Sequence, residues 1–183
     1  MAFNSNDRAW LEGLFDTYYD RVYAFLYARC GNKSTAEDLT GQTFVKIAEN
    51  FRSYNSEKGA VSTWIFTIAL NKMRSHFRRQ RETVDFSVIS ELVASDGTEA
   101  EYMQNETKNE LLSILSQLDE RSRSVITLKY YGELANREIG NLLELSESNV
   151  GTILSRAIQK LKKSMKLCDE TVVYAYKSQE GKR

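Results

Sequence analysis

The chain contains no proline, and this absence constrains the fold more than any other feature of the sequence. None of the 183 residues is proline and only 9 are glycine. Sheets that fold into sandwiches or barrels need many tight turns, which glycine and proline usually form. Segments without proline are instead compatible with long helices. We therefore predict an all-α protein.

The cysteine content and the distribution of apolar residues indicate the cellular compartment of the protein. Two cysteines are too few for a disulfide scaffold or a cysteine-based zinc site, which favours a reducing, cytoplasmic location. The N-terminal Asp7, Arg8 and Glu12 do not suit a secretory signal. The most apolar stretch, residues 60–70, is too short to span a bilayer, so we expect no membrane insertion.

Charge is segregated along the chain although the formal net charge is zero. Residues 1–82 carry a balance of +3, residues 83–120 a balance of −8, and residues 121–183 a balance of +5. Two basic blocks joined by an acidic connector indicate that the outer blocks contact a polyanion. The alternative is that each segment only makes its own surface soluble.

Apolar residues recur at helical spacing on both sides of the acidic connector. The pattern predicts two small helical domains, residues 1–84 and 107–167, joined by a flexible acidic linker at 85–106 and followed by a tail at 168–183. Gly31 should end the first helix, and Ser34 should begin the second with Glu37 as the partner of a capping box. The expected helices cover residues 11–29, 34–51, 61–81, 111–118, 122–131, 136–143 and 147–165.

The second basic block has the spacing of a helix-turn-helix that reads DNA. A short helix at 137–143 is followed by a turn at 144–146 and by a longer helix that Ser146 caps. The first turns of the longer helix would enter the major groove, where amide, hydroxyl and guanidinium groups meet bases and phosphates. The alternative is an ordinary helical hairpin with a basic face. The turn also has Glu144 where glycine is usual.

The first basic block combines cations with aromatic residues. Residues 72–81 hold five cations and no acid, and Trp64, Phe66 and Phe77 lie close by. Cations that follow phosphates and aromatic rings that stack on unpaired bases are typical of single-strand binding. The alternative for each ring is packing in the core. The chain has one histidine and lacks a phosphate-binding loop, a nucleophile elbow and a histidine-based triad, so we expect no metal, no cofactor and no enzymatic activity.

Five segments follow one another along the chain: LFDTYYDRVY at 14–23, AEDLTGQTF at 36–44, WIFTIALN at 64–71, and residues 118–131 and 138–157. In this order they resemble the extracytoplasmic-function group of bacterial sigma factors. The first is similar to the first helix of the family, the second to its polymerase-binding signature, the third to its most recognisable motif, and the last two to the halves of region four. The resemblance covers about residues 10–82 and 108–165.

This resemblance implies a region-two domain at 1–84, a region-four domain at 107–167, and a sigma factor that directs core RNA polymerase to promoter DNA. It implies that region two binds the melted −10 element through Thr63, Trp64, Asn71, Lys72, Arg74, Arg78 and Arg79. It implies that region four binds the −35 element through Ser148, Asn149, Thr152, Ser155 and Arg156. The polymerase contacts that it implies are Glu37, Asp38, Thr40 and Gln42. An anti-sigma protein is a further expected partner, and no small-molecule substrate is expected.

The sequence departs from the family pattern at several positions. Gly41, Ser75, Asp119, Gly140 and Gly151 replace residues that are common there, and Gly151 removes one expected DNA contact. Two other interpretations remain open at this point. A helix-turn-helix regulator with an N-terminal sensing domain would leave residues 64–81 unexplained, and a helical adaptor for protein partners would lack salt-dependent DNA affinity.

Overall fold

The computed structural model describes residues 4–83 and 112–165, and within these ranges it is helical with short turns and no strand. The predicted all-α fold is confirmed. The acidic linker and the tail fall outside the described residues. The helices are α1 (Ser5–Cys30), α2 (Lys33–Asn50), α3 (Val61–Thr83), α5 (Glu120–Tyr130), α6 (Asn136–Leu143) and α7 (Glu147–Met165). Residues 112–116 form a further helical turn before α5.

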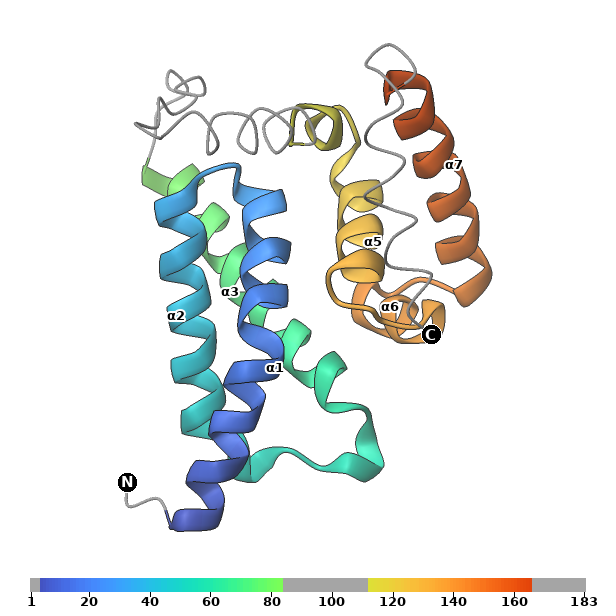
Figure 1. The fold of residues 1–183 in the computed structure, drawn as a ribbon. Coiled ribbons are helices and arrows are strands. Elements are labelled where there is room, and N and C mark those ends of the chain that lie inside the picture. The colour runs from blue at the N-terminus through green and yellow to red at the C-terminus, as the bar shows by residue number, and fades with distance from the viewer. Residues whose placement is uncertain (1–3, 84–111, 166–183) are drawn as a thin grey trace.

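The helices α1, α2 and α3 form one bundle, which we call the N-terminal group (Figure 1). Its core is built from aliphatic and aromatic side chains that recur at helical spacing. Phe25 of α1 meets Phe66 of α3 edge to face, with ring centroids 5.4 Å apart. Both rings are fully buried, so Phe66 is a core residue and cannot stack on a base. For this ring the packing alternative is correct.

Capping side chains set where the first two helices begin and end. The side chain of Asn4 accepts the amide of Asp7, which starts α1 six residues before the predicted start at Leu11. Gly31 ends α1 in the left-handed conformation, with φ of 66°, as predicted. The expected cap at Ser34 is wrong, because Asn32 accepts the amide of Thr35 instead. Glu37 therefore has no capping role.

The helices α5, α6 and α7 form the C-terminal group. Asp119 caps α5 by accepting the amide of Ser122 at 2.9 Å. The hydroxyl of Ser122 donates to the same carboxylate at 2.6 Å, and this bond, followed by that of the amide, lowers the pKa of the Asp119 carboxyl. Ser146 caps α7 as predicted, with the amide of Asn149 donating to its hydroxyl at 3.2 Å. Val125, Leu128, Ile139 and Val150 are buried between these helices.

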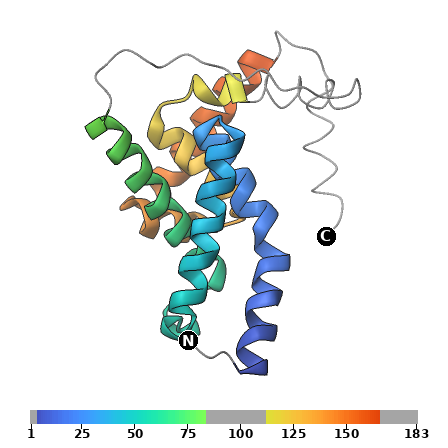
Figure 2. The same cartoon turned by 90° about the vertical axis from the view of Figure 1, so that its left-hand side faces the viewer.

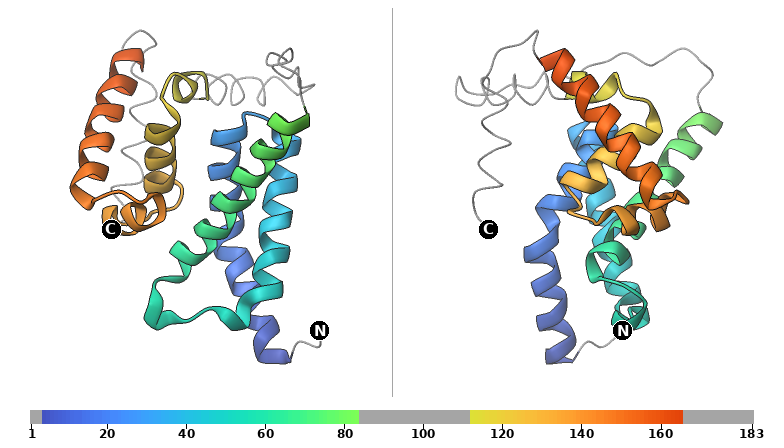
Figure 3. Two further views of the ribbon diagram at one scale, coloured as in Figure 1. Left: turned by 180° about the vertical axis from the view of Figure 1, so that it is seen from behind. Right: turned by 90° about the vertical axis from the view of Figure 1, so that its right-hand side faces the viewer.

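The two groups pack against each other through α1 with α5 and through α3 with α6. Figures 2 and 3 show from further directions that the C-terminal group lies along one side of the three-helix bundle. The buried apolar residues of both groups belong to one continuous core. The structure thus holds together two helical groups that are separated by a long stretch of sequence.

Candidate nucleic-acid interface

The helices α6 and α7 form the predicted helix-turn-helix. Ile139 and Val150 fill the angle between them and are fully buried. The amide of Leu145 donates to the carbonyl oxygen of Gly140 at 2.8 Å, which closes the turn. Glu144 stands in this turn with φ of 57°, the left-handed conformation for which glycine is usual. The turn therefore forms without glycine, at a conformational cost.

One face of α7 is polar and exposed. Thr152 lies on it and donates its hydroxyl to the carbonyl oxygen of Ser148 at 3.0 Å. A Cβ atom on Gly151 would meet only Asn136, at 3.9 Å, so the backbone of α7 has room for a larger side chain there. The structure brings together on this face, all of them exposed, Ser148, Asn149, Thr152, Ser155 and Arg156.

The helix α3 carries the second predicted set, from its first turn to near its end. Thr63, Trp64 and Lys72 are half-buried. The exposed members of the set are Asn71, Arg74, Arg78 and Arg79. The set thus begins with a half-buried hydroxyl and indole in the first turn of the helix, and its exposed cations lie toward the other end. An arrangement of this kind can hold a polyanion along the helix axis.

Sequence reasoning missed an aromatic row next to Trp64. The ring of Tyr54 lies with its centroid 5.4 Å from that of Trp64 and 6.0 Å from that of Trp10, on which it stacks. A shallow pocket of about 420 Å³ lies at Trp10, with Asn6, Asp7, Phe51 and Tyr54 as its other lining residues. Tyr54 could have been suspected from its place in the loop before α3. Trp10 could not, because no sequence pattern relates it to that loop.

The third predicted set lies on α2 and is only partly accessible. Glu37, Asp38 and Gln42 are exposed. Thr40 is fully buried and donates its hydroxyl to the carbonyl oxygen of Ala36 at 2.7 Å. In this arrangement the side chain of Thr40 is inaccessible to a partner, because it is buried and bonded to its own helix.

Sequence reasoning also missed apolar surface beside this set. Phe15 is 46% exposed and Val45 is 60% exposed. The ring of Phe15 meets that of Phe44 at 5.1 Å, which joins α1 and α2 at this surface. The exposed ring of Phe15 and the side chain of Val45 thus add apolar surface on α1 and α2.

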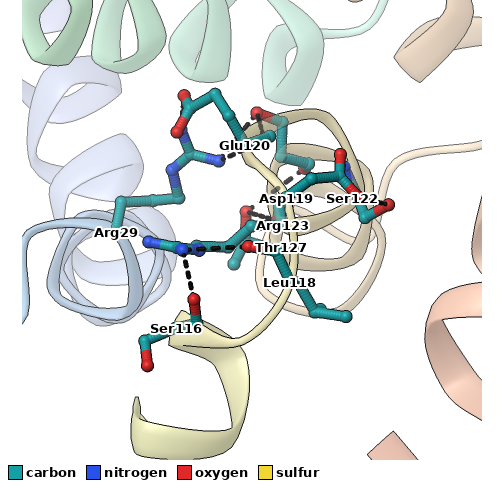
Figure 4. A network of polar contacts seen from close by, with 9 residues as sticks. Arg29, Ser116, Leu118, Asp119, Glu120, Ser122, Arg123 and Thr127 are labelled. Atoms are coloured by element: carbon teal, nitrogen blue, oxygen red, sulfur yellow. Dashed lines mark hydrogen bonds and ion pairs between the residues drawn. The ribbon is translucent and has the colours of Figure 1, made fainter. Parts of the chain in front are cut away.

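Polar contacts between the two helical groups converge on α1. The side chain of Arg29 is 2% exposed, and its guanidinium donates to the carboxylate of Glu120 (Figure 4). It also donates to the hydroxyl of Ser124 at 2.7 Å. Arg21 donates to the carbonyl oxygens of Tyr131 and Gly132, at 3.2 and 2.6 Å. These bonds satisfy a buried cation and the free carbonyl groups that follow α5.

A further contact reaches the predicted −10 surface. The hydroxyl of Thr63 donates to one carboxylate oxygen of Glu138 at 2.5 Å. The other oxygen of Glu138 accepts the amide of Ala135 at 2.7 Å and so caps α6. Thr63 is thus engaged by the helix-turn-helix.

Burial changes the ionisation of several groups at the end of α1 and at the C-terminal group. Desolvation raises the pKa of the Cys30 thiol to about 11. Desolvation also raises the pKa of Tyr131. It lowers the pKa of Arg29, against the opposing attraction of Glu120. Cys30 is therefore a protonated, weakly reactive thiol at neutral pH.

In the part of the chain that the structure describes, no His, Cys, Asp or Glu side chains gather in a group that could hold a metal ion. Within residues 4–83 and 112–165, no helix has the length and the apolar character that crossing a membrane requires.

Comparisons with known protein families match both helical groups. Residues 14–83 match the model of sigma-70 region 2, and residues 108–161 match the model of sigma-70 region 4. The chain is 30% identical over 155 residues to the ECF RNA polymerase sigma factor SigM of Bacillus subtilis, covering 83% of this chain and 93% of SigM. It is 32% identical over 160 residues to the RNA polymerase sigma factor YlaC of the same organism, covering 85% of this chain and 91% of YlaC.

The fold is similar to that of solved sigma factors. CnrH, solved in complex with the cytosolic domain of CnrY, superposes with a TM-score of 0.66 at 22% identity, covering 90% of this chain and 92% of that chain. RpoE of Bartonella quintana, solved with the anti-sigma factor NepR, gives a TM-score of 0.67 at 19% identity, covering 86% of this chain and 98% of that chain.

The chain belongs to the sigma-70 family. Within that family it is an RNA polymerase sigma factor of the ECF group, which directs promoter-specific initiation of transcription. Sigma factors are initiation factors and in general not enzymes. The regulator interpretation falls, because the match to region 2 accounts for the residues at 64–81 that it leaves unexplained. The adaptor interpretation falls, because both helical groups match regions of a family of transcription initiation factors.

Proposed function

We propose that α7 reads the −35 element as duplex DNA. The observation that supports this role is the single exposed face that carries Ser148, Asn149, Thr152, Ser155 and Arg156. Asn149 and Arg156 can pair with base edges in the major groove, and the hydroxyl groups can bind phosphates. Lys160, Lys162 and Lys163 lie further along the same helix, where they would meet the DNA backbone.

The helix α3 holds the melted −10 element in this proposal. Trp64 offers a ring on which an unpaired base stacks, and Thr63 and Asn71 offer hydrogen-bonding groups beside it. Unstacking a base costs a few kcal/mol, which stacking and hydrogen bonds to the extruded base offset. Lys72, Arg74, Arg78 and Arg79 then bind the neighbouring phosphates.

The exposed face of α2 binds core RNA polymerase in this proposal. Glu37, Asp38 and Gln42 form its polar part. Because Asn32 and not Ser34 caps α2, the carboxylate of Glu37 has no part in the helix cap. The expected capping box therefore does not account for the glutamate at this position, which leaves its carboxylate available for binding.

The domain bounds, a further partner and the cellular location are proposed from the same role. Region two corresponds to residues 1–84 and region four to residues 107–167, with 85–106 as the linker and 168–183 as a tail. The relative RpoE is solved with an anti-sigma factor, and the chain has a fold like it. An anti-sigma protein that holds this chain inactive is therefore a proposed partner, and the cytoplasm is its proposed location.

Transcription from duplex and pre-melted templates tests the −10 role. The variant Asn71→Ala removes an exposed amide and little packing. With core polymerase we expect it to open duplex promoters more slowly than the wild type, and a pre-melted −10 bubble should restore much of the lost transcript. If Asn71→Ala melts normally and opens duplex promoters at the wild-type rate, Asn71 has no role at the −10 element.

A further inference from the structure

Three aromatic rings connect the start of α1 to the first turn of α3. The ring of Tyr54 lies between the other two, with its centroid 6.0 Å from that of Trp10 and 5.4 Å from that of Trp64. Figure 1 shows that the start of α1 and the connection between α2 and α3 lie at the same end of the three-helix bundle. The role proposed for α3 uses only Trp64. We call the three rings the aromatic row.

The shallow pocket described above lies at the α1 end of the aromatic row. Its volume of about 420 Å³ is in the range of sites that hold small ligands. Trp10, Phe51 and Tyr54 form its aromatic wall, and Asn6 and Asp7 add polar groups. The three rings are only half-buried and Asn6 is exposed. Flat aromatic faces beside hydrogen-bonding groups suit a planar ring with polar atoms at its edge.

Contacts of the loop between α2 and α3 hold this wall in place. The hydroxyl of Tyr54 donates to the carbonyl oxygen of Gly59 at 3.3 Å. The guanidinium of Arg52 donates to Oδ2 of Asp7 at 3.1 Å, which ties the loop to α1. A site that is already ordered loses less conformational entropy when a ligand binds. The pocket is therefore preorganised for a rigid, planar ligand.

The polar groups of the pocket favour a base that carries an amino group. A carboxylate only accepts hydrogen bonds, whereas a carboxamide both donates and accepts them. Oδ2 of Asp7 accepts from Arg52 and from the amide of Asn4, and among the described residues Oδ1 is left for a ligand. Adenine, cytosine and guanine have an exocyclic amino group that donates to such oxygens, and thymine has none. The pocket thus disfavours thymine.

The surroundings of the pocket favour a nucleic acid over a protein segment. Its wall is continuous with Trp64, which the proposed function places against an unpaired base. The next base of the same strand is therefore held close to the pocket. Arg52 and Lys58 are exposed cations of the adjoining loop, and cations there attract phosphates.

We propose that the pocket at Trp10 holds a second unpaired base of the melted promoter strand, next to the base at Trp64. The ring of Trp10 stacks on this second base, and Asn6 and Asp7 bind its amino edge. The inference rests on the proposed role of α3 at the −10 element and adds the start of α1 to the DNA-binding surface. The promoter preference of this chain then includes a melted position at which thymine is disfavoured.

Removal of single bases from a pre-melted promoter tests this site in the holoenzyme. Core polymerase with the full chain is bound to templates in which one unpaired nucleotide at a time lacks its base, and the affinity for each template is measured. The position held by α3 is the one at which Asn71→Ala reduces the cost of removing the base. Trp10→Leu keeps an apolar side chain but removes the ring, and its matched control, Trp10→Phe, keeps a ring.

The wild type should lose at least about fivefold in affinity when the base is removed at either of two neighbouring positions, as expected for a single stack. Trp10→Leu should lose this sensitivity at the second position only, and Trp10→Phe should retain it. If Trp10→Leu loses sensitivity at no position next to the one held by α3, the second site is overturned and the −10 role stands. If the wild type has no sensitive position, the −10 role fails and the second site fails with it.

A second variant covers the case in which Trp10→Leu does not fold. Asn6→Ala changes an exposed side chain of the pocket, and its control, Ser5→Ala, changes an exposed side chain of the same turn that does not line the pocket. Each of the four bases is placed next to the position that Asn71→Ala identifies. The wild type and Ser5→Ala should bind thymine about three- to tenfold more weakly than cytosine, and Asn6→Ala should reduce this difference. Equal binding of all four bases by the wild type overturns the proposal.

Discussion

The carbonyl oxygen of Leu145 lies 2.6 Å from the position that a Cβ atom on Gly140 would occupy. The same two residues share the hydrogen bond that closes the turn of the helix-turn-helix. The close approach gives a structural reason for glycine at this position. Any side chain there pushes against backbone, which cannot rotate away as a flexible side chain can.

We therefore expect Gly140→Ala to destabilise the protein by about 1–3 kcal/mol, the usual cost of overpacking, despite the better helix propensity of alanine. Urea unfolding followed by circular dichroism measures the change. The control is Gly13→Ala in α1, where a Cβ atom would meet nothing within 4 Å. This control should stabilise by about 0.5–1 kcal/mol. A neutral or stabilising Gly140→Ala would show that the turn can relax.

Glu144 provides a prediction of the opposite sign. It has φ of 57°, a conformation that costs a residue with a Cβ atom about 1–2 kcal/mol. Glu144→Gly removes this conformational cost, because glycine adopts the conformation freely. The gain is partly offset, because glycine also raises the entropy of the unfolded chain. We expect a net stabilisation of about 0.5–1 kcal/mol in urea unfolding. Gln159→Gly, within α7, should instead destabilise by about 1 kcal/mol. Loss of stability in Glu144→Gly would contradict the conformation found at this turn.

Arg156 and Lys163 separate reading of bases from contact with the backbone. Both are exposed on α7, but Arg156 lies on the proposed −35 face and Lys163 lies two turns further along. Arg156→Ala should cost roughly 1–3 kcal/mol and relax the preference for one −35 sequence. Lys163→Ala should weaken all sequences alike and reduce the salt dependence. Binding assays with matched and mismatched promoters in holoenzyme measure both. Equal losses that do not depend on sequence would refute the docking of α7.

The partly buried thiol of Cys30 makes stability fall at alkaline pH. Its pKa is raised to about 11, so the folded state keeps the proton that the unfolded chain releases near pH 9. The stability that this group contributes is fully present below pH 9 and is lost as the pH rises from about 9 to 11, by roughly 2–3 kcal/mol. Tyr131, whose pKa burial also raises, adds a loss at higher pH.

Urea unfolding at pH 7, 9 and 10.5 measures this loss, and Cys30→Ala should reduce it. In a Cys168→Ser background, Cys30 should also react with a thiol reagent at least about 100-fold more slowly than a free cysteine. The reason is that the thiolate fraction at neutral pH falls tenfold for each unit by which the pKa rises. Rapid labelling in the native protein would contradict the burial of this thiol.

The periodicity of apolar residues was sufficient to predict the helices and the helix-turn-helix, because burial of one face is a local property of sequence. The ends of helices were harder. Asn32 and Ser34 are both good caps, and only the structure shows which of them accepts an amide. The accessibility of Thr40 and Phe66 also needed the structure, since residues that look alike in sequence can face the core or the solvent.

The contacts between the two groups could not be predicted from the sequence at all. Arg29 and Glu120 are separated by 91 positions, and no periodic pattern relates them. The same holds for the row of Trp10, Tyr54 and Trp64, which comes from three separate elements. Contacts of this kind depend on the packing of whole helices, which a single sequence does not encode in any local pattern.

Run-off transcription with purified core RNA polymerase on sheared genomic DNA tests the central claim most directly. Transcripts are sequenced with and without the protein. We predict that the protein adds a discrete set of start sites, preceded by two shared sequence elements at a fixed spacing, and that Arg156→Ala loses selectivity for the upstream one. If no start sites are added, while the isolated chain binds specific duplex tightly and core polymerase does not change that binding, the chain does not act as a sigma factor.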